Sequence, residues 1–493
     1  MSFIRNIQRA LKENIREYGM FIALFAIMAI FTVTTDGLFI SSRNISNLLN
    51  QTGYIAVLAV GMTLVIVIRH IDLSVGFLAG FLGALSAIGL TQWNLPVYIA
   101  IPMVMVFGII AGLLTGFLVA QLGIPSFVAS LAGMLVYRGS LLMVTLKTGT
   151  IVIPDETFNA IGNGFIPDII GLQILPDMHK LTLITGLIAI AFFVFSEFRN
   201  RRTKLSYDFE VLPIDMFIIK TVFVSLLIFA ITWILAGYNG LSWTVVIILI
   251  VVAIYHYVTN ETVLGRYIYA VGGNPEAAEL SGINVKKIIF IVFGSMGMLS
   301  ALSGILFASR LRSATTVAGT LFELDAIAAV FIGGAAVAGG VGTVLGSMIG
   351  GLVMGVLNLG LANMSVDSNW IQIIKGLVLL GAVAFDVISK MRGKPSFIDM
   401  VLRAVGGRSR AVGAVEEPAA VAGPTEASRV TASAVAASGQ VGSVTATEPA
   451  PEGATAVAPI LGHDGPRSGH LDATEAAVRE PQPAGRSRPA GRR

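Results

Sequence analysis

Apolar runs about as long as a bilayer core is thick recur between residues 19 and 389, separated by short polar breaks. A helix that crosses the core needs about 20 mostly apolar residues. Hydrophobic residues make up 55% of the chain and charged residues only 13%, which is too little polar surface for a soluble protein of this length. We therefore expect an all-α polytopic membrane protein. Its predicted spans are 19–35, 52–69, 74–91, 97–120, 127–145, 181–197, 216–236, 241–258, 288–308, 324–339, 341–363 and 370–389.

The span count is about twelve, and the pattern allows ten to twelve because the run 324–339 is short enough to be a broken or re-entrant helix. If every run crosses, the basic residues of segments 5–16, 199–204, 266–287 and 390–394 fall on one side. The positive-inside rule assigns that side to the cytoplasm. The transmembrane domain, residues 19–390, is thus predicted to have both termini in the cytoplasm.

Both ends of the chain lie outside these spans. Residues 1–18 place apolar residues at helical spacing between basic ones, which predicts an amphipathic helix on the inner leaflet. A cleaved signal peptide, the alternative, lacks a convincing cleavage site. Residues 404–493 are rich in small and polar residues, and no aromatic residue follows Phe397. This composition predicts a disordered cytoplasmic tail.

Glycines recur at every fourth position in two spans, at 108–116 and at 342–350. Such spacing is ordinary where membrane helices pack closely. On the predicted topology the two glycine-rich spans cross the membrane in opposite senses. That arrangement is consistent with an inverted repeat of residues 52–145 and 288–389, a plan that transporters with a midplane pathway often use.

A polar loop, residues 260–287, separates the eighth and ninth runs and contains the sequence GGNPEAAELSG. Asn274 can cap a helix, Pro275 suits the first helical position, and Glu276 favours the positive N-terminal end. Gly282 offers a left-handed stop. We therefore predict a rigid helix of about two turns, with a small apolar surface from Ala277, Ala278 and Leu280 and charge for a partner from Glu276 and Glu279.

Charged and polar residues near span ends are candidates for the pathway. The segment Arg69–Ser74 is expected at a hydrated interface, with Asp72 or Ser74 capping the next helix, or lining an inner gate. Glu323 and Asp325 suit the docking face for a binding protein, a pathway mouth or a solvated helix N-terminus. Lys375 can snorkel outward without a special role. The predicted pathway or gate residues are Asp72, Ser74, Asp325 and Asn358.

Several chemistries are excluded or disfavoured. The chain has no cysteine, and its five histidines are scattered singly, so we expect no metal and no bound cofactor. No GxxxxGK[ST] loop occurs, so any ATP used must bind to another polypeptide. The net charge of +4 is spread between loops and tail rather than gathered on one surface. We therefore expect no nucleic-acid partner.

Four motifs resemble the sugar permease subunits of ATP-binding-cassette (ABC) importers, in the ribose, xylose and multiple-monosaccharide branch. They are GMTLVIVIRHIDLSVG at 61–76, GIPSFVASLAGMLVYRG at 123–139, GRYIYAVGGNPEAAELSGINVKK at 265–287 and AVFIGGAAVAGGVGTVLGSMIGG at 329–351. The resemblance covers about residues 53–387. It implies a non-enzymatic permease subunit in the inner membrane that carries a monosaccharide, xylose or a related pentose or aldohexose.

The resemblance also implies partners: a separate ATPase subunit, an extracytoplasmic sugar-binding protein, and a second permease copy in a homodimer, all at a lipid membrane. It implies that the polar loop couples to the ATPase. The coupling residues would be Gly273, Asn274, Pro275, Glu276, Ala277, Ala278, Glu279, Ser281 and Gly282.

Three alternatives remain. A branched-chain amino-acid ABC permease shares similar glycine-rich spans. A secondary transporter would need deep carboxylates or cation-coordinating broken helices, and none is evident from the sequence. An ATP-independent sugar facilitator would not need a docking helix.

Overall fold

The computed structural model describes residues 15–146, 148–169, 178–209, 211 and 213–390. These residues belong to one structural unit, residues 1–409, whereas the second unit, residues 410–493, is outside the described part. Most of the predicted N-terminal amphipathic helix, residues 1–14, and the whole predicted tail, 404–493, therefore lie outside the described residues.

The described residues are dominated by helices, which confirms the predicted all-α polytopic class. Eight helices are long and apolar enough to cross a membrane, and three shorter apolar helices accompany them. In chain order the helices are α2 (Ile15–Thr34), the short η1 (Leu38–Ile40), α3 (Ser42–Val67), α4 (Val75–Thr91), α5 (Val97–Ala120), α6 (Ser126–Thr145), α7 (Glu156–Asn163), α8 (Lys180–Ser206), α9 (Ile214–Ala236), α10 (Trp243–Glu261), α11 (Val263–Gly273), α12 (Pro275–Leu280), α13 (Val285–Leu311), α14 (Phe322–Ile332), α15 (Val344–Asn363) and α16 (Ser368–Lys390).

The predicted span 324–339 is not a membrane crossing. Helix α14 has only 11 residues and ends at Ile332. That is about 17 Å of helix, against the roughly 30 Å of a bilayer core. Gly333 and Gly334 follow it, and Gly334 has a left-handed backbone with φ +87°. The structure thus adopts the broken-helix alternative at this point.

Helices α3 and α13 form the centre of the bundle. Helix α13 packs against α3, α4 and α5, and its glycines allow close contact. A Cβ on Gly112 of α5 would lie 2.1 Å from the carbonyl oxygen of Phe293 in α13. The glycine spacing therefore serves helix packing here, while the inverted repeat stays a prediction.

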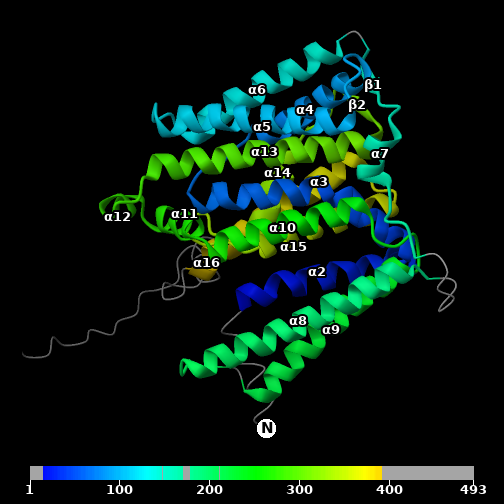
Figure 1. The fold of residues 1–493 in the computed structure, drawn as a ribbon, viewed down its shortest axis with the longest axis vertical. Coiled ribbons are helices and arrows are strands. Elements are labelled where there is room, and N and C mark those ends of the chain that lie inside the picture. Colours follow the sequence, from blue (N-terminus) through cyan, green and yellow to red (C-terminus); the bar gives the residue numbers. More distant parts are fainter. Residues whose placement is uncertain (1–14, 147, 170–177, 210, 212, 391–493) are drawn as a thin grey trace, which may run out of the picture. The chain divides into compact units, whose positions relative to one another are not determined.

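The two ends of the bundle differ in character (Figure 1). Helix α12 and the C-terminal ends of α8 and α16 lie at one end. At the other end, β1 (Thr150–Val152) pairs antiparallel with β2 (Ser313–Thr315), with Ile151 opposite Ala314, beside α7. The basic segment 199–204 closes α8, so the described basic segments share one end, as predicted.

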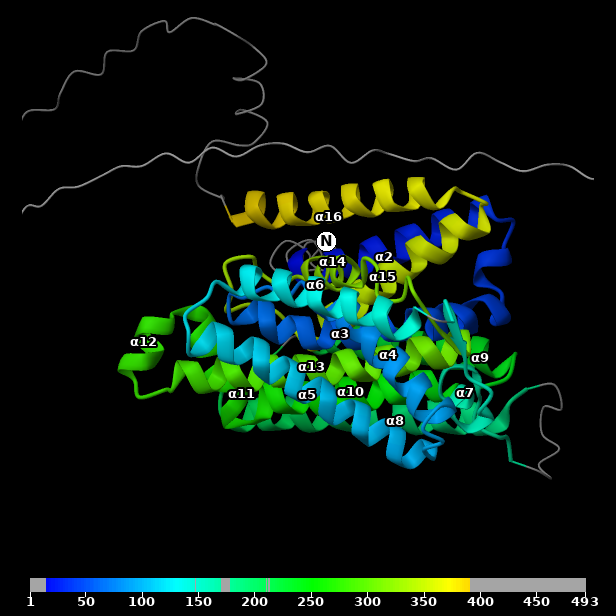
Figure 2. The same cartoon turned by 90° about the horizontal axis from the view of Figure 1, so that it is seen from above.

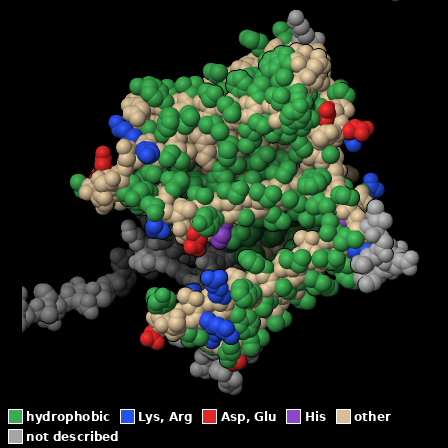
Figure 3. Space-filling model, in the orientation of Figure 1, with side chains coloured by type: hydrophobic (Ala, Val, Ile, Leu, Met, Phe, Trp, Pro, Cys, Tyr) green, Lys and Arg blue, Asp and Glu red, His purple; other side chains and the backbone are tan. Residues whose placement is uncertain are grey.

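Hydrophobic side chains cover the middle of the face seen in Figure 3, and charged side chains lie mostly toward its two ends. This is the distribution expected of a protein surrounded by lipid. Figure 2 shows α16 along the outside of the bundle, beside α14. Helix α16 packs on α14 and α15, and this packing brings the last span to the broken helix.

Candidate coupling surface and translocation cavity

The predicted docking helix is present as α12. The Asn274 side chain accepts a hydrogen bond from the Ala277 backbone N at 3.1 Å, and Pro275 begins the helix. After Ser281, Gly282 adopts a left-handed backbone with φ +83°. The cap, the first residue and the stop all lie where the sequence predicts them, so local chemistry defines this helix.

Helix α12 presents a mixed surface to solvent. Glu276, Ala277 and Glu279 are exposed, and Leu280 is 90% exposed. Ala278 is only 4% exposed and packs into the main hydrophobic core. Of the three residues predicted to form the apolar surface of this helix, Ala278 therefore packs inward and attaches α12 to the rest of the protein.

The helix before α12, which the sequence reading treated as loop, ends beside the end of α3. Arg69, just after α3, donates from Nε to the Gly272 carbonyl oxygen at 2.6 Å. Its Nη2 also donates to the carbonyl oxygen of Gly273. Arg69 has a left-handed backbone, φ +66°, which is unusual for a residue with a side chain. The guanidinium thus joins the ends of α3 and α11.

The loop after the broken helix α14 meets the same point. The Gly340 backbone N donates to the Val67 carbonyl oxygen at 2.8 Å. The Tyr269 hydroxyl, on α11, donates to the carbonyl oxygen of Gly342 at 2.7 Å. We call these contacts, together with those of Arg69, the three-way junction. It links the docking helices to α3 and to the segment that carries α14.

Asp72 and Ser74 lie in a different environment from the predicted one. They are 3% and 1% exposed, so the expectation of a hydrated interface is wrong for both. Asp72 Oδ1 accepts hydrogen bonds from Ser74 N at 2.9 Å and Ser74 Oγ at 2.6 Å. Ser74 occupies the N-cap position of α4 without making a side-chain cap bond. Burial raises the pKa of Asp72.

A polar cavity of about 700 Å³ lies between α3, α13, α14, α15 and α16. Asp325 and Asn358 both line this cavity, so two of the four predicted pathway residues are brought together. Asp72 and Ser74 do not line it, and their role as gate residues stays a prediction. The lining includes the C-terminal end of α13, whereas α12 precedes the N-terminal end of the same helix. We call this space the outer cavity, because it lies toward the end of the bundle opposite α12.

A buried ion pair forms part of the wall of the outer cavity. Lys375 Nζ lies 2.5 Å from Asp325 Oδ1, and the two side chains are 15% and 7% exposed. The prediction that Lys375 snorkels outward without a role is therefore wrong. The reading of Glu323 and Asp325 as solvated acids is also wrong, because both residues are buried. Since α14 is a half-helix, its acidic N-terminus lies inside the bundle.

Three aromatic rings contact one another in the outer cavity. The ring centroids of Tyr54 and Phe322 are 4.4 Å apart, and Phe307 lies 5.1 Å from Tyr54 and 4.9 Å from Phe322. The sequence reading missed this cluster because the rings come from three elements. The wall of the cavity thus combines an aromatic surface with amides and one ion pair.

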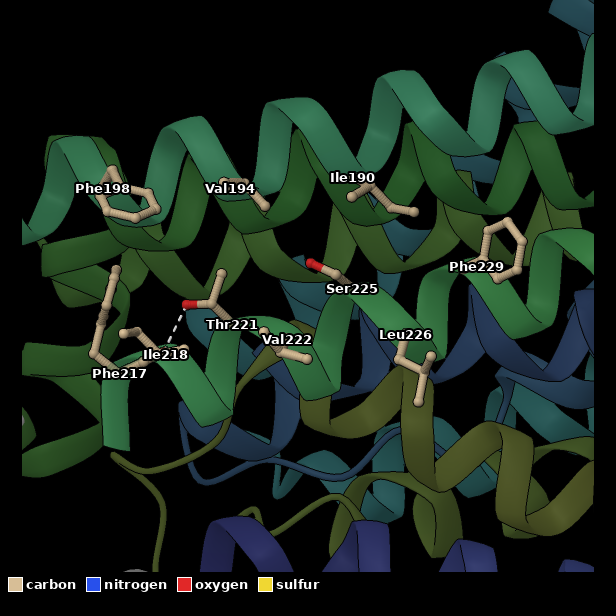
Figure 4. Close-up of a pocket in the computed structure, with 10 residues that line it drawn as sticks. All are labelled: Ile190, Val194, Phe198, Phe217, Ile218, Thr221, Val222, Ser225, Leu226 and Phe229. Carbon is tan, nitrogen blue, oxygen red and sulfur yellow. Dashed lines mark hydrogen bonds between the residues drawn. The ribbon is translucent and has the colours of Figure 1, made fainter. Parts of the chain in front are cut away.

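A second cavity has a different character. It holds about 490 Å³ and lies between α8 and α9, where hydrophobic side chains such as Ile190, Val194 and Leu226 line it (Figure 4). Within the described residues, α8 packs mainly against α9. This cavity offers almost no hydrogen-bonding groups to a polar solute, so the outer cavity is the better candidate for a polar cargo.

No cluster of three His, Asp or Glu side chains that could hold a metal ion occurs in the part of the chain that the structure describes. The features of this structure are those of a membrane transporter: a polytopic helical fold, a broken helix with a buried ion pair, and a polar cavity beside that helix.

Comparison with known proteins defines the family. Residues 44–383 match the family described as "Branched-chain amino acid transport system / permease component". The xylose transport system permease protein of Haemophilus influenzae is 38% identical over 380 residues, 77% of this chain and 98% of that protein. Its Escherichia coli K12 counterpart is 37% identical over 77% of this chain and 93% of that protein.

The ribose import permease protein of Haemophilus influenzae is 34% identical over 75% of this chain and 93% of that protein. No solved structure is a significant match. The chain therefore belongs to this family of transport-system permease components.

Proposed function

We propose that this chain is the permease subunit of an ABC importer that carries a monosaccharide, xylose or a closely related pentose or aldohexose, into the cell. The observation that carries the proposal is the similarity to xylose permeases along nearly their whole length. The family's heading names branched-chain amino acids, but the relatives reported above transport xylose and ribose.

The chain is proposed to move sugar without hydrolysing ATP itself. A separate ATPase would dock on α12, where Glu276, Glu279 and Leu280 are exposed. Docking there would put α12 in the cytoplasm, which agrees with the positive-inside rule for the basic segments at the same end of the bundle. Both chain termini would then be cytoplasmic. An extracytoplasmic binding protein would deliver sugar at the opposite end, and a second copy of the chain would complete the pathway.

Movement is proposed to pass from α12 to the outer cavity through the three-way junction. Arg69 and Gly340 connect the docking helices with α3 and with the loop after α14. At its other end, the first turn of α14 carries Asp325, which pairs with Lys375. A rigid shift of α12 would therefore reach the cavity through one short, packed route.

An ion-coupled carrier was disfavoured because the sequence offered no deep carboxylate. The structure overturns that expectation, because Asp325 and Glu323 are both buried. Asp325 is paired with Lys375, which leaves its carboxylate less suited to binding a coupling cation. The similarity to permease components along most of the chain favours the ABC importer over this alternative.

The proposal is tested by uptake of labelled xylose, ribose, glucose, galactose and arabinose in cells that express the chain and the binding protein. Each sugar is measured with and without the ATPase. We expect uptake that needs the ATPase and selects xylose or a near relative. Uptake that persists without the ATPase would identify a facilitator or an ion-coupled carrier instead.

A further inference from the structure

Three amide side chains in the outer cavity have hydrogen-bonding groups to offer. Gln51, Asn358 and Gln372 line the cavity, and no hydrogen bond of their side chains is found within the described part of the chain. The Tyr54 hydroxyl, which also lines the cavity, is likewise without a hydrogen bond there. Each amide carries donors and an acceptor. A solute with several hydroxyl groups would satisfy both kinds of group at once.

The aromatic cluster supplies the complementary apolar surface. Tyr54, Phe307 and Phe322 are in mutual contact and all line the cavity. A sugar ring has apolar C–H faces and a polar edge of hydroxyls, so it fits a site with one aromatic wall and amides around it. An inorganic ion has no apolar face that could pack against the rings.

The charges of the cavity argue against a cationic ligand. Asp325 and Lys375 neutralise each other at 2.5 Å. The third charged group of the lining, Arg310, donates to the side-chain oxygens of Asn163 at 2.9 Å and Asn47 at 3.4 Å. Since Asn163 and Asn47 are neutral, the Arg310 charge has no carboxylate partner among the lining residues. A ligand ammonium would therefore meet no unpaired carboxylate in the lining, whereas a neutral polyol meets unpaired amides.

We infer that the outer cavity is a monosaccharide subsite. The sugar ring lies against Tyr54 and Phe322, Asn358 and Gln372 bind its hydroxyls, and the Asp325–Lys375 pair closes the wall beside it. This inference rests on the proposed function, and it adds that the permease contacts its cargo itself rather than leaving recognition entirely to a binding protein.

The absence of native cysteine makes the subsite directly testable. In the full chain, Ser368→Cys places a near-isosteric thiol in the cavity lining, and Val317→Cys places one on a residue that is 70% exposed outside it. The purified protein is labelled with a polar maleimide in the presence of xylose or of sucrose at equal osmolarity. Xylose at about ten times its dissociation constant should slow labelling of Ser368→Cys about tenfold and leave Val317→Cys unchanged.

Two further variants in the Ser368→Cys background identify the contacts. Gln372→Ala changes an exposed side chain on α16 and should weaken xylose protection without disturbing the fold. Tyr54→Leu should weaken protection more than Tyr54→Phe, which keeps the ring. Equal labelling rates with xylose and with sucrose would overturn the subsite. If the native chain nevertheless imports xylose with its ATPase, only the subsite is wrong and the proposed function stands. If no ATPase-dependent uptake occurs, the proposed function is wrong as well.

Discussion

Arg69 donates from its Nε to the Gly272 carbonyl oxygen at 2.6 Å, and this bond joins residues that lie 203 positions apart in the chain. The bond connects the end of α3, at the centre of the bundle, to the helix that precedes α12. A Cβ on Gly272 would lie 2.0 Å from the Val67 carbonyl oxygen. The backbones therefore meet where no side chain fits, and the guanidinium fastens them together.

Replacing this guanidinium should uncouple transport without detaching the ATPase. Hydrogen bonds from a charged group contribute about 1.5–3 kcal/mol each, so Arg69→Gln should lower the initial uptake rate at least about tenfold. Binding of the ATPase to α12 should stay unchanged in a pull-down. Arg266→Gln is the matched control, because Arg266 is exposed on α11. Normal uptake by Arg69→Gln would show that the junction does not transmit movement.

The exposed acids of α12 should govern docking. Glu276 lies in the first turn of α12 and is exposed. Glu276→Lys reverses its charge, and like charges across an interface cost several kcal/mol. We expect loss of permease-stimulated ATP hydrolysis with normal amounts of the chain in the membrane. The matched control is Glu261→Lys, at the exposed end of α10, which should stimulate the ATPase as the native chain does. Equal stimulation by both variants would rule out the docking role.

A paired disruption of the helix ends tests the same helix by another route. Pro275→Gly together with Gly282→Val removes the preset first turn and places a β-branched residue at φ +83°. The α12 helix should lose its order while the rest of the bundle folds. ATPase stimulation is expected to disappear, and the chain should still reach the membrane. Retained stimulation would mean that docking does not need an ordered α12.

The Asp325–Lys375 pair should matter more when it is broken than when it is removed. Removing one partner leaves the other charge buried, which costs about 3–5 kcal/mol. Asp325→Asn and Lys375→Met should therefore each lower the melting temperature of the purified chain. The double variant should recover part of that loss, because neither charge remains. Additive effects in this double-mutant cycle would contradict the ion pair.

Close packing of α5 on α13 should tolerate no added methyl group. A Cβ at Gly112 meets the Phe293 carbonyl oxygen at 2.1 Å, whereas one at Gly139 in α6 meets nothing within 4 Å. Gly112→Ala should destabilise the fold by about 1–3 kcal/mol. Gly139→Ala should leave it unchanged or slightly more stable. Thermal unfolding in detergent measures both variants. Similar melting temperatures would mean that α5 and α13 can move apart to accommodate the added methyl group at no cost in stability.

The sequence predicted what local chemistry determines. Composition and run length located the long apolar helices, although the run 324–339 is not a crossing. The cap, proline and glycine around α12 located its ends. These signals lie within a few residues of the feature they predict. The prediction failed where a side chain's surroundings depend on distant segments. Asp325 looked interfacial because it begins an apolar run, but the run breaks at Ile332 and leaves its start inside the bundle.

The same limit explains the missed contacts. Lys375 lies 50 positions beyond Asp325 in the chain, and nothing in either span marks them as partners. Tyr54, Phe307 and Phe322 read as ordinary span residues until three helices bring them together. The three-way junction needs α3, α11 and the loop after α14 to converge. Such contacts depend on how distant segments pack together. The residue pattern around any one position does not show which distant residue it will contact.

The central claim is that ATP hydrolysis by a separate subunit drives a monosaccharide through this chain. The most direct test is accumulation of labelled xylose in proteoliposomes that contain the chain and its ATPase, with the binding protein supplied on the extracytoplasmic side. We predict that ATP supplied to the ATPase raises the concentration of xylose in the receiving compartment above that in the donor compartment. A hydrolysis-deficient ATPase should abolish this gradient. Equilibration of xylose at the same rate with either ATPase, with no gradient formed, would contradict the account.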